Sequence, residues 1–260
     1  PFIGAIPLCK LRPLAIENML SQLRKRKNRR GQPVRESTVQ HYLSAVSAVL
    51  SDAKRNEIIQ TNPARMIDLP TTNRMEQHIP TVQEVQRLLQ ALSMEPRHFR
   101  VFYLLAMATG CRRGELCALQ WQDIDWEQRS IHICRSAVKI TGDEIFVKEP
   151  KTRSGDRYVY FSAQMENLLR EHRRACQYIT TIYDERELDT NDFLFRRQGT
   201  RLPMTPTTFT WRFKCILKKN GLPQELNVHS LRHTAASLMI AGGTDVATVA
   251  GILGHSQPST

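Results

Sequence analysis

Apolar residues recur at helical spacing in two stretches near the start of the chain. The first stretch comprises Leu14, Ile16, Met19, Leu20 and Leu23, and the second Val39, Tyr42, Leu43, Val46, Val49 and Leu50. Each set shares one side of a helix, because residues three and four positions apart lie on the same helical face. Ser37, with Gln40 three residues later, has the form of a capping box that would start the second helix. The pattern predicts a small helical domain over residues 1–70.

A run of polar and turn-forming residues follows this domain. It covers residues 71–80 and predicts a linker. Thr81 and Glu84 then form a second capping box, which would start the first helix of a larger domain over residues 81–260.

The larger domain is expected to contain a buried helix close to its start. Residues 99–108 are apolar on nearly every side, and Gly110 is placed to end this helix as a C-cap. Further helices are expected at residues 115–120, 163–179, 206–219, 230–241 and 245–253.

Three short segments change from helical spacing to the pattern of strands. They are residues 130–134, 145–147 and 158–161, which are rich in β-branched and aromatic side chains. Residues 148–157, between the last two, are basic and turn-forming and are expected at the tip of a hairpin. The fold class that follows is mainly α with one small antiparallel β-sheet (α+β), in two domains.

The charge of the chain indicates a class of partner. The 260 residues carry a net charge of +12 with a pI near 9.8, which favours nucleic acid first and an anionic membrane surface second. No apolar run approaches membrane-spanning length, and the apolar start lacks the basic leader and cleavage site of a signal peptide. The six cysteines form no Cys-x-x-Cys pair, which argues against a zinc knuckle and favours reduced thiols in the cytoplasm.

The positive charge is concentrated in the first domain. Residues 1–70 hold 12 Lys+Arg against 5 Asp+Glu, which is more than half of the excess. Six of the seven residues 24–30 are basic, namely Arg24, Lys25, Arg26, Lys27, Arg29 and Arg30. We interpret this run as a contact to DNA phosphates that does not depend on base sequence, with a targeting signal as the alternative.

Arg112 follows Gly110 on a turn, where its side chain could be aimed at a ligand. Arginine is permanently charged, and its planar fork bonds phosphate oxygens in pairs. Glu115 is close enough in sequence to hold this guanidinium through a charge-assisted hydrogen bond. The alternative is a surface Arg–Glu pair at a helix start, which contributes little to stability.

His229, Arg232 and His233 are spaced to share one face of a helix. A zinc metalloprotease site would need glutamate directly after the first histidine, and Ser230 stands there. A phosphate would suit all three side chains, and free N–H groups near the helix start would add to its attraction. The alternative is a buried, hydrogen-bonded histidine beside a solvated arginine.

Lys151 lies in the basic segment with Lys148, Arg153 and Arg157. A lysine in that position could reach a phosphate or donate a proton to a leaving oxygen. The alternative is a solvated basic loop that touches only the DNA backbone, which suits Lys148 and Arg153 better.

Together these segments resemble the tyrosine recombinase (phage integrase) family. The matching segments are residues 109–116 (TGCRRGEL), Lys151-Thr152, residues 229–233 (HSLRH) and residues 253–255 (LGH). Their order and separations agree over roughly residues 75–260, and residues 1–70 resemble the core-binding domain of the family more weakly. The Lys-Thr pair and the Leu-Gly-His segment are similar to those of integrases from phages and conjugative transposons.

The resemblance implies that Arg112 and Arg232 hold the scissile phosphate and offset the charge of its five-coordinate transition state. Glu115 would orient Arg112, and His255 would bond a non-bridging oxygen. Lys151 would be the general acid for the 5′ oxygen.

The same resemblance implies that His229 assists proton movement, with His233 in support. Lys148 and Arg153 would contact the DNA backbone. The family uses a tyrosine that attacks phosphorus and forms a 3′-phosphotyrosyl link, so neither a metal nor a nucleotide cofactor is implied.

The sequence departs from the family in its nucleophile. The family's tyrosine falls a few residues beyond Thr260, and the tyrosines present all precede His229. We therefore expect these 260 residues to be a fragment that binds DNA without cleaving it.

The resemblance also implies an assembly. Two domains would form a C-shaped clamp around double-stranded DNA at attachment or transposon-end sites, as a tetramer at full length and as one monomer per site in this shorter form. An excisionase or a host DNA-bending protein would be an accessory partner. Two alternatives are a non-catalytic DNA-binding module with the same fold and a strand-passing enzyme of the type IB topoisomerase kind.

Overall fold

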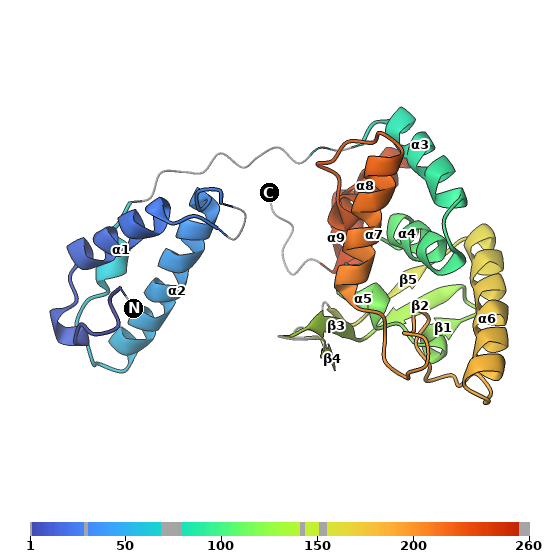
Figure 1. The fold of residues 1–260 in the computed structure, drawn as a ribbon, viewed down its shortest axis with the longest axis horizontal. Helices are drawn as coiled ribbons and strands as arrows, with labels where there is room; N and C mark the ends of the chain where they lie inside the picture. Colours follow the sequence, from blue (N-terminus) through green and yellow to red (C-terminus); the bar gives the residue numbers. More distant parts are fainter. Residues whose placement is uncertain are drawn as a thin grey trace. The chain divides into compact units, whose positions relative to one another are not determined.

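The computed structural model describes residues 2–28, 31–68, 78, 80–140, 144–150 and 155–254. The chain divides into two compact units, Pro1–Glu76 and Gln77–Thr260, which are drawn in Figure 1. The linker expected at residues 71–80 falls almost entirely outside the described residues.

The first unit is built from two helices, α1 (Pro13–Lys25) and α2 (Glu36–Arg55), with short 3-10 turns at Leu8–Lys10 and Pro63–Met66. Ile16 and Leu20 of α1 pack with Val39 and Leu50 of α2 in a small core. Part of the expected apolar stripe on α2 does not reach this core, because Val49 remains 66% exposed.

The expected cap at Ser37 is wrong. Helix α2 begins at Glu36 with Arg35 as its N-cap, and no side chain closes that cap. The Glu36 carboxylate instead accepts hydrogen bonds from Arg24 of α1, 3.0 Å from Nε. This ion pair ties the first turn of α2 to α1, and the helix begins two residues earlier than a cap at Ser37 would place it.

The second unit contains the helices α3 (Val82–Ser93), α4 (Arg97–Thr109), α5 (Arg113–Cys117), α6 (Ala163–Tyr183), α7 (Pro206–Lys219), α8 (Val228–Ala241) and α9 (Val246–Leu253). The capping box at Thr81 and Glu84 is confirmed. The buried helix expected at residues 99–108 is confirmed as α4, which Figure 1 shows enclosed by its neighbours. Phe102 of α4 stacks on Phe209 of α7 at 3.7 Å between ring centroids, and this contact joins the two helices at the centre of the core.

Two small antiparallel sheets lie beside the helices. One has the strand order β1 (Ile124–Asp125), β2 (Ser130–Ile133), β5 (Arg157–Tyr160), and the other pairs β3 (Ser136–Lys139) with β4 (Ile145–Lys148). Helix α5 packs on β3.

The strand pairing expected from the sequence is wrong. The strand near residue 145 pairs with β3, which the sequence pattern did not reveal, and β5 pairs with β2. Residues 148–157 therefore connect two sheets and do not close a hairpin between paired strands. The physical reason is that β3 supplies the nearer partner, through an antiparallel register that pairs Lys139 with Ile145.

Gly110 ends α4 in the left-handed conformation, with φ +64°. Its missing side chain has a packing consequence as well, because a Cβ there would overlap the Leu253 side chain at the end of α9. The C-terminal ends of α4 and α9 therefore approach each other closely at this glycine.

His172 of α6 makes the second unit sensitive to acid. Its ring is 3% exposed, and Nε2 donates to the Leu194 carbonyl at 2.9 Å. Burial lowers the pKa of His172 to about 4, so the unfolded chain binds this proton more readily than the folded chain does between pH 6.5 and 4. Stability present above pH 6.5 is lost as the pH falls, by about 2 kcal/mol at pH 5.

The expected result is that urea unfolding at pH 7 and pH 5 gives a smaller pH dependence for His172→Gln than for the parent. Glutamine can donate to the Leu194 carbonyl but does not titrate. An identical pH dependence in the two proteins would assign the acid sensitivity to other groups.

Candidate active site

Arg112 lies on the turn between α4 and α5 and is the N-cap residue of α5. Glu115, three residues later, accepts from the Arg112 backbone N–H at 2.8 Å and from Nη1 at 2.8 Å. The Arg112 side chain is 44% exposed, whereas the Glu115 side chain is 7% exposed. Glu115 therefore holds both the backbone and the fork of Arg112 and leaves part of the fork open to solvent.

Arg232 reaches the same place from α8. It is 2% exposed, and its Nη1 and Nη2 donate to the carbonyls of Gly110 and Leu253 at 2.8 and 2.7 Å. Arg112 Nη2 donates to the neighbouring carbonyl of Gly254 at 2.9 Å. Two arginines far apart in the sequence thus meet at the C-terminal end of α9.

The closeness of Arg112 also affects the pKa of Arg232. Burial is the main cause that lowers it to about 10, and the charge of Arg112 is the next. Arg232 remains charged at neutral pH, so two cations stand side by side. An anion placed between them would relieve their repulsion.

Arg157 of β5 is a third member of this cluster, which sequence reasoning did not assign to the site. Its Nη2 and Nη1 donate to the two oxygens of Glu115 at 2.8 and 3.3 Å, and its Nε donates to the Ile252 carbonyl at 2.7 Å. The signal that could have revealed it is the strand alternation. Arg157 shares its buried face with Val159, and the alternate residues Tyr158 and Tyr160 are exposed.

The cluster has a net positive charge. Arg112, Arg157 and Arg232 contribute three positive charges against the single carboxylate of Glu115. Burial alone would raise the pKa of Glu115, but its hydrogen bonds to Arg157 and Arg112 outweigh burial and hold the pKa below its usual range. The carboxylate is therefore ionised, and the site suits an anion with several oxygen acceptors.

His229 and His233 lie on α8 beside Arg232. Their rings make an edge contact at 4.7 Å between centroids, with His229 exposed and His233 half-buried. Burial, followed by the charge of Arg232, lowers the pKa of His233. The prediction of free N–H groups at this helix start is wrong in part. The Asn227 side chain accepts hydrogen bonds from the amides of residues 229 and 230.

Several predicted residues are not placed. Arg29, Arg30, Lys151, Arg153 and His255 lie outside the described residues. Lys148 ends β4 opposite Ser136.

The basic run of the first unit is partly engaged with its own unit. Arg24 is bonded to Glu36, and the Arg26 guanidinium lies 4.5 Å from the centroid of the Phe2 ring. The backbone of Lys27 forms an isolated antiparallel β-bridge with that of Pro33, and Lys25 is the last residue of α1.

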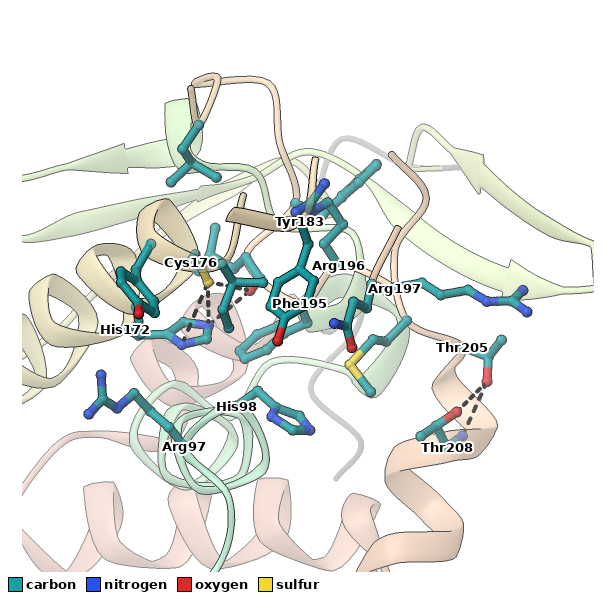
Figure 2. Close-up of a pocket in the computed structure, with 18 of the residues that line it drawn as sticks. Arg97, His98, His172, Cys176, Tyr183, Phe195, Arg196, Arg197, Thr205 and Thr208 are labelled. Atoms are coloured by element: carbon teal, nitrogen blue, oxygen red, sulfur yellow. Dashed lines mark hydrogen bonds between the residues drawn. The ribbon is translucent and has the colours of Figure 1, made fainter. Parts of the chain in front are cut away.

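A separate cavity of about 990 Å³ lies between α6, the segment that follows it, and the starts of α4 and α7 (Figure 2). Figure 2 shows His98, Cys176 and Phe195 around it, with Tyr183 projecting over it. The arginines of the cluster do not line this cavity. It is therefore distinct from the candidate site.

The tyrosines of the second unit have other surroundings. Tyr103 is buried and donates to the Phe209 carbonyl at 2.7 Å, while Tyr158 and Tyr160 lie on the face of β5 opposite Arg157. Tyr178 and Tyr183 line the cavity of Figure 2.

Metal-binding clusters and membrane-spanning helices are both absent among the described residues. No group of three or more His, Cys, Asp or Glu side chains there could hold a metal ion. Among the same residues, no helix has the length and apolar character needed to cross a bilayer.

Related sequences point to one family. Residues 80–260 match the phage integrase family. The chain is 26% identical over 223 residues to the ICEBs1 integrase of Bacillus subtilis, covering 86% of this chain and 59% of that protein. It is 28% identical over 195 residues to a XerC-like tyrosine recombinase of Caldanaerobacter subterraneus, covering 68% and 47%. The chain thus spans about half of the length of these relatives.

Solved structures share the fold. The Tn1549 transposon integrase in complex with a circular intermediate DNA aligns with a TM-score of 0.79 at 20% identity, covering 99% of this chain and 82% of that chain. A lambda integrase dimer bound to a core site aligns with a TM-score of 0.64 at 19% identity, covering 97% and 82%. The family match extends over well more than half of the sequence. The chain belongs to the phage integrase family of tyrosine recombinases.

Proposed function

We propose that this chain is the phosphate-binding part of a site-specific recombinase, or integrase, that cuts and rejoins double-stranded DNA. The observation that carries the proposal is the meeting of Arg112 and Arg232 at the end of α9. Two guanidinium forks at one place can bond the non-bridging oxygens of a phosphodiester and offset the charge of its transition state.

In the proposed reaction a tyrosine oxygen attacks phosphorus, and the bond to the 5′ oxygen breaks as the new O–P bond forms. Lys151 gives its proton to the departing 5′ oxygen, His229 assists proton movement, and His255 bonds a non-bridging oxygen. The 3′-phosphotyrosyl link conserves the bond energy, so that attack by a 5′-hydroxyl can rejoin the strand.

The nucleophile is proposed to belong to a longer form of the protein. Tyr103 is bonded to the Phe209 carbonyl, and Tyr158 and Tyr160 lie on the face of β5 opposite Arg157, so none of the three faces the arginine cluster. This supports a nucleophilic tyrosine beyond Thr260. These 260 residues would then bind DNA without cleaving it.

The remaining parts of the proposal concern DNA contacts and assembly. Residues 1–70 would be the core-binding domain, with the run at 24–30 against phosphates, and residues 81–260 the catalytic domain. The two would clamp the duplex, and the full-length protein would assemble as a tetramer. Lambda integrase, a relative in fold, is described as a tetramer bound to a Holliday junction.

The test compares these 260 residues with the full-length protein on a nicked DNA substrate that traps the covalent intermediate. Both should bind DNA. The logarithm of the association constant should fall linearly with the logarithm of the salt concentration, with a slope of about −0.9 for each phosphate that the protein neutralises. A covalent protein–DNA adduct is expected from the full-length protein alone. An adduct from the 260 residues would refute the position of the nucleophile, and none from either protein would refute the recombinase function.

A further inference from the structure

Arg157 joins three segments that are far apart in the sequence. It is the first residue of β5. Its guanidinium donates hydrogen bonds to both carboxylate oxygens of Glu115 in α5 and to the Ile252 carbonyl in the last turn of α9. Its Nη2 also lies 3.8 Å from the Cys111 sulfur on the turn that carries Arg112. All three guanidinium nitrogens of Arg157 donate hydrogen bonds within the protein, so we assign it no ligand of its own.

Glu115 is shared between two arginines. Arg157 bonds the carboxylate from one side in a bidentate manner, and Arg112 bonds it through its backbone N–H and Nη1. A bidentate pair fixes the plane of a carboxylate as well as its position. The plane of the Glu115 carboxylate in turn sets the direction of the Arg112 fork.

The end of α9 is held in the same way. The carbonyls of residues 252, 253 and 254 accept from Arg157, Arg232 and Arg112, respectively. The last carbonyls of a helix have no partner within the helix, and cations are favourable there. Arg157 therefore helps to hold in place the helix end whose carbonyls accept hydrogen bonds from Arg232 and Arg112.

We propose that Arg157 is a positioning residue for strand cleavage, which acts on Arg112 through Glu115 and on Arg232 through the end of α9. The inference rests on the proposed function. A purely structural role would lower stability without changing the reaction of folded protein. A positioning role lowers the rate of cleavage in protein that is folded and bound to DNA.

The experiment uses full-length Arg157→Gln and Arg157→Lys proteins, with single-turnover cleavage at saturating protein and DNA affinity measured separately. Glutamine should reduce the cleavage rate about 100-fold with less than about a threefold change in affinity. Arg157→Lys should cleave about tenfold faster than Arg157→Gln, because lysine keeps the charge. It should remain slower than the parent, because lysine cannot bond Glu115 and Ile252 at once with a planar fork.

Arg196→Gln is the matched control. Arg196 is equally buried, with its side chain 10% exposed, and it too bonds a carboxylate, Asp184, and a backbone carbonyl, Thr200. Its loss should lower stability and leave the cleavage rate of folded protein within about threefold.

A second readout tests the route through Glu115. The part of the loss that passes through Glu115 is already absent in Glu115→Gln, so adding Arg157→Gln should slow that protein about tenfold or less, against about 100-fold in the parent. The remaining loss measures the route through the end of α9. Hydrogen exchange over residues 109–117 should also quicken in Arg157→Gln. Cleavage by Arg157→Gln at the parent rate overturns the positioning role alone, whereas absence of an adduct from the parent overturns the proposed function.

Discussion

Replacing Arg232 with alanine is expected to slow DNA strand cleavage by the full-length protein at least about a thousandfold, while DNA affinity changes little. A preorganised donor to a transition-state oxygen contributes about 10²–10³ in rate, and an arginine on a transferring phosphoryl group contributes more. Arg232 is held by the carbonyls of Gly110 and Leu253, so its fork is oriented before DNA arrives. Affinity is spread over many basic residues, so the loss of one affects it modestly.

The measurement is the single-turnover rate of covalent adduct formation, with affinity taken from a parallel titration. Arg232→Lys should recover only part of the rate, because a lysine is a point charge without a planar fork. Arg196→Ala, which removes an arginine bonded to Asp184 outside the cluster, should cleave at nearly the parent rate. Adduct formation by Arg232→Ala within tenfold of the parent would contradict a role for Arg232 on the phosphate.

Gly110→Ala should destabilise the second unit by about 2–4 kcal/mol, the sum of left-handed backbone strain and overpacking. The φ of Gly110 is +64°, and a Cβ there would overlap the Leu253 side chain and lie 3.4 Å from the Ala235 Cβ. For a domain of this size the melting temperature should fall by roughly 10 °C. Circular dichroism during heating measures this change.

Gly199→Ala separates the two causes. Gly199 has a similar φ of +70°, but no heavy atom lies within 4 Å of the position of its Cβ. It should therefore show only the backbone strain, a smaller loss of about 1 kcal/mol. Equal losses at the two positions would mean that the contact with Leu253 contributes nothing.

Local signals in the sequence were sufficient for most helices. The capping box at Thr81 and the glycine at position 110 specify a helix start and a helix end through groups within a few residues. The all-round apolar character of residues 99–108 likewise indicated a central helix, which is α4. These features depend on short-range chemistry that a single sequence contains.

Contacts between segments far apart in the sequence were harder to predict. The pairing of β3 with β4 depends on which of several short strands meet, and the early start of α2 depends on the ion pair of Glu36 with Arg24. The approach of Arg112 to Arg232 came from a family resemblance, because no periodicity links residues so far apart. Arg157 was placed in a loop by its basic neighbours, although its burial follows from strand alternation.

At the end of α9 the arginine cluster is bonded to main-chain oxygens, those of residues 252–254. Substitution of Ile252 or Leu253 leaves every carbonyl acceptor in place, whereas Gly254, with φ +69°, is in a conformation that favours glycine. For the same reason an alanine scan of the last turn of α9 is blind to this contact. Replacing single amide bonds with esters, which weakens one carbonyl acceptor at a time, is the chemistry that reaches it.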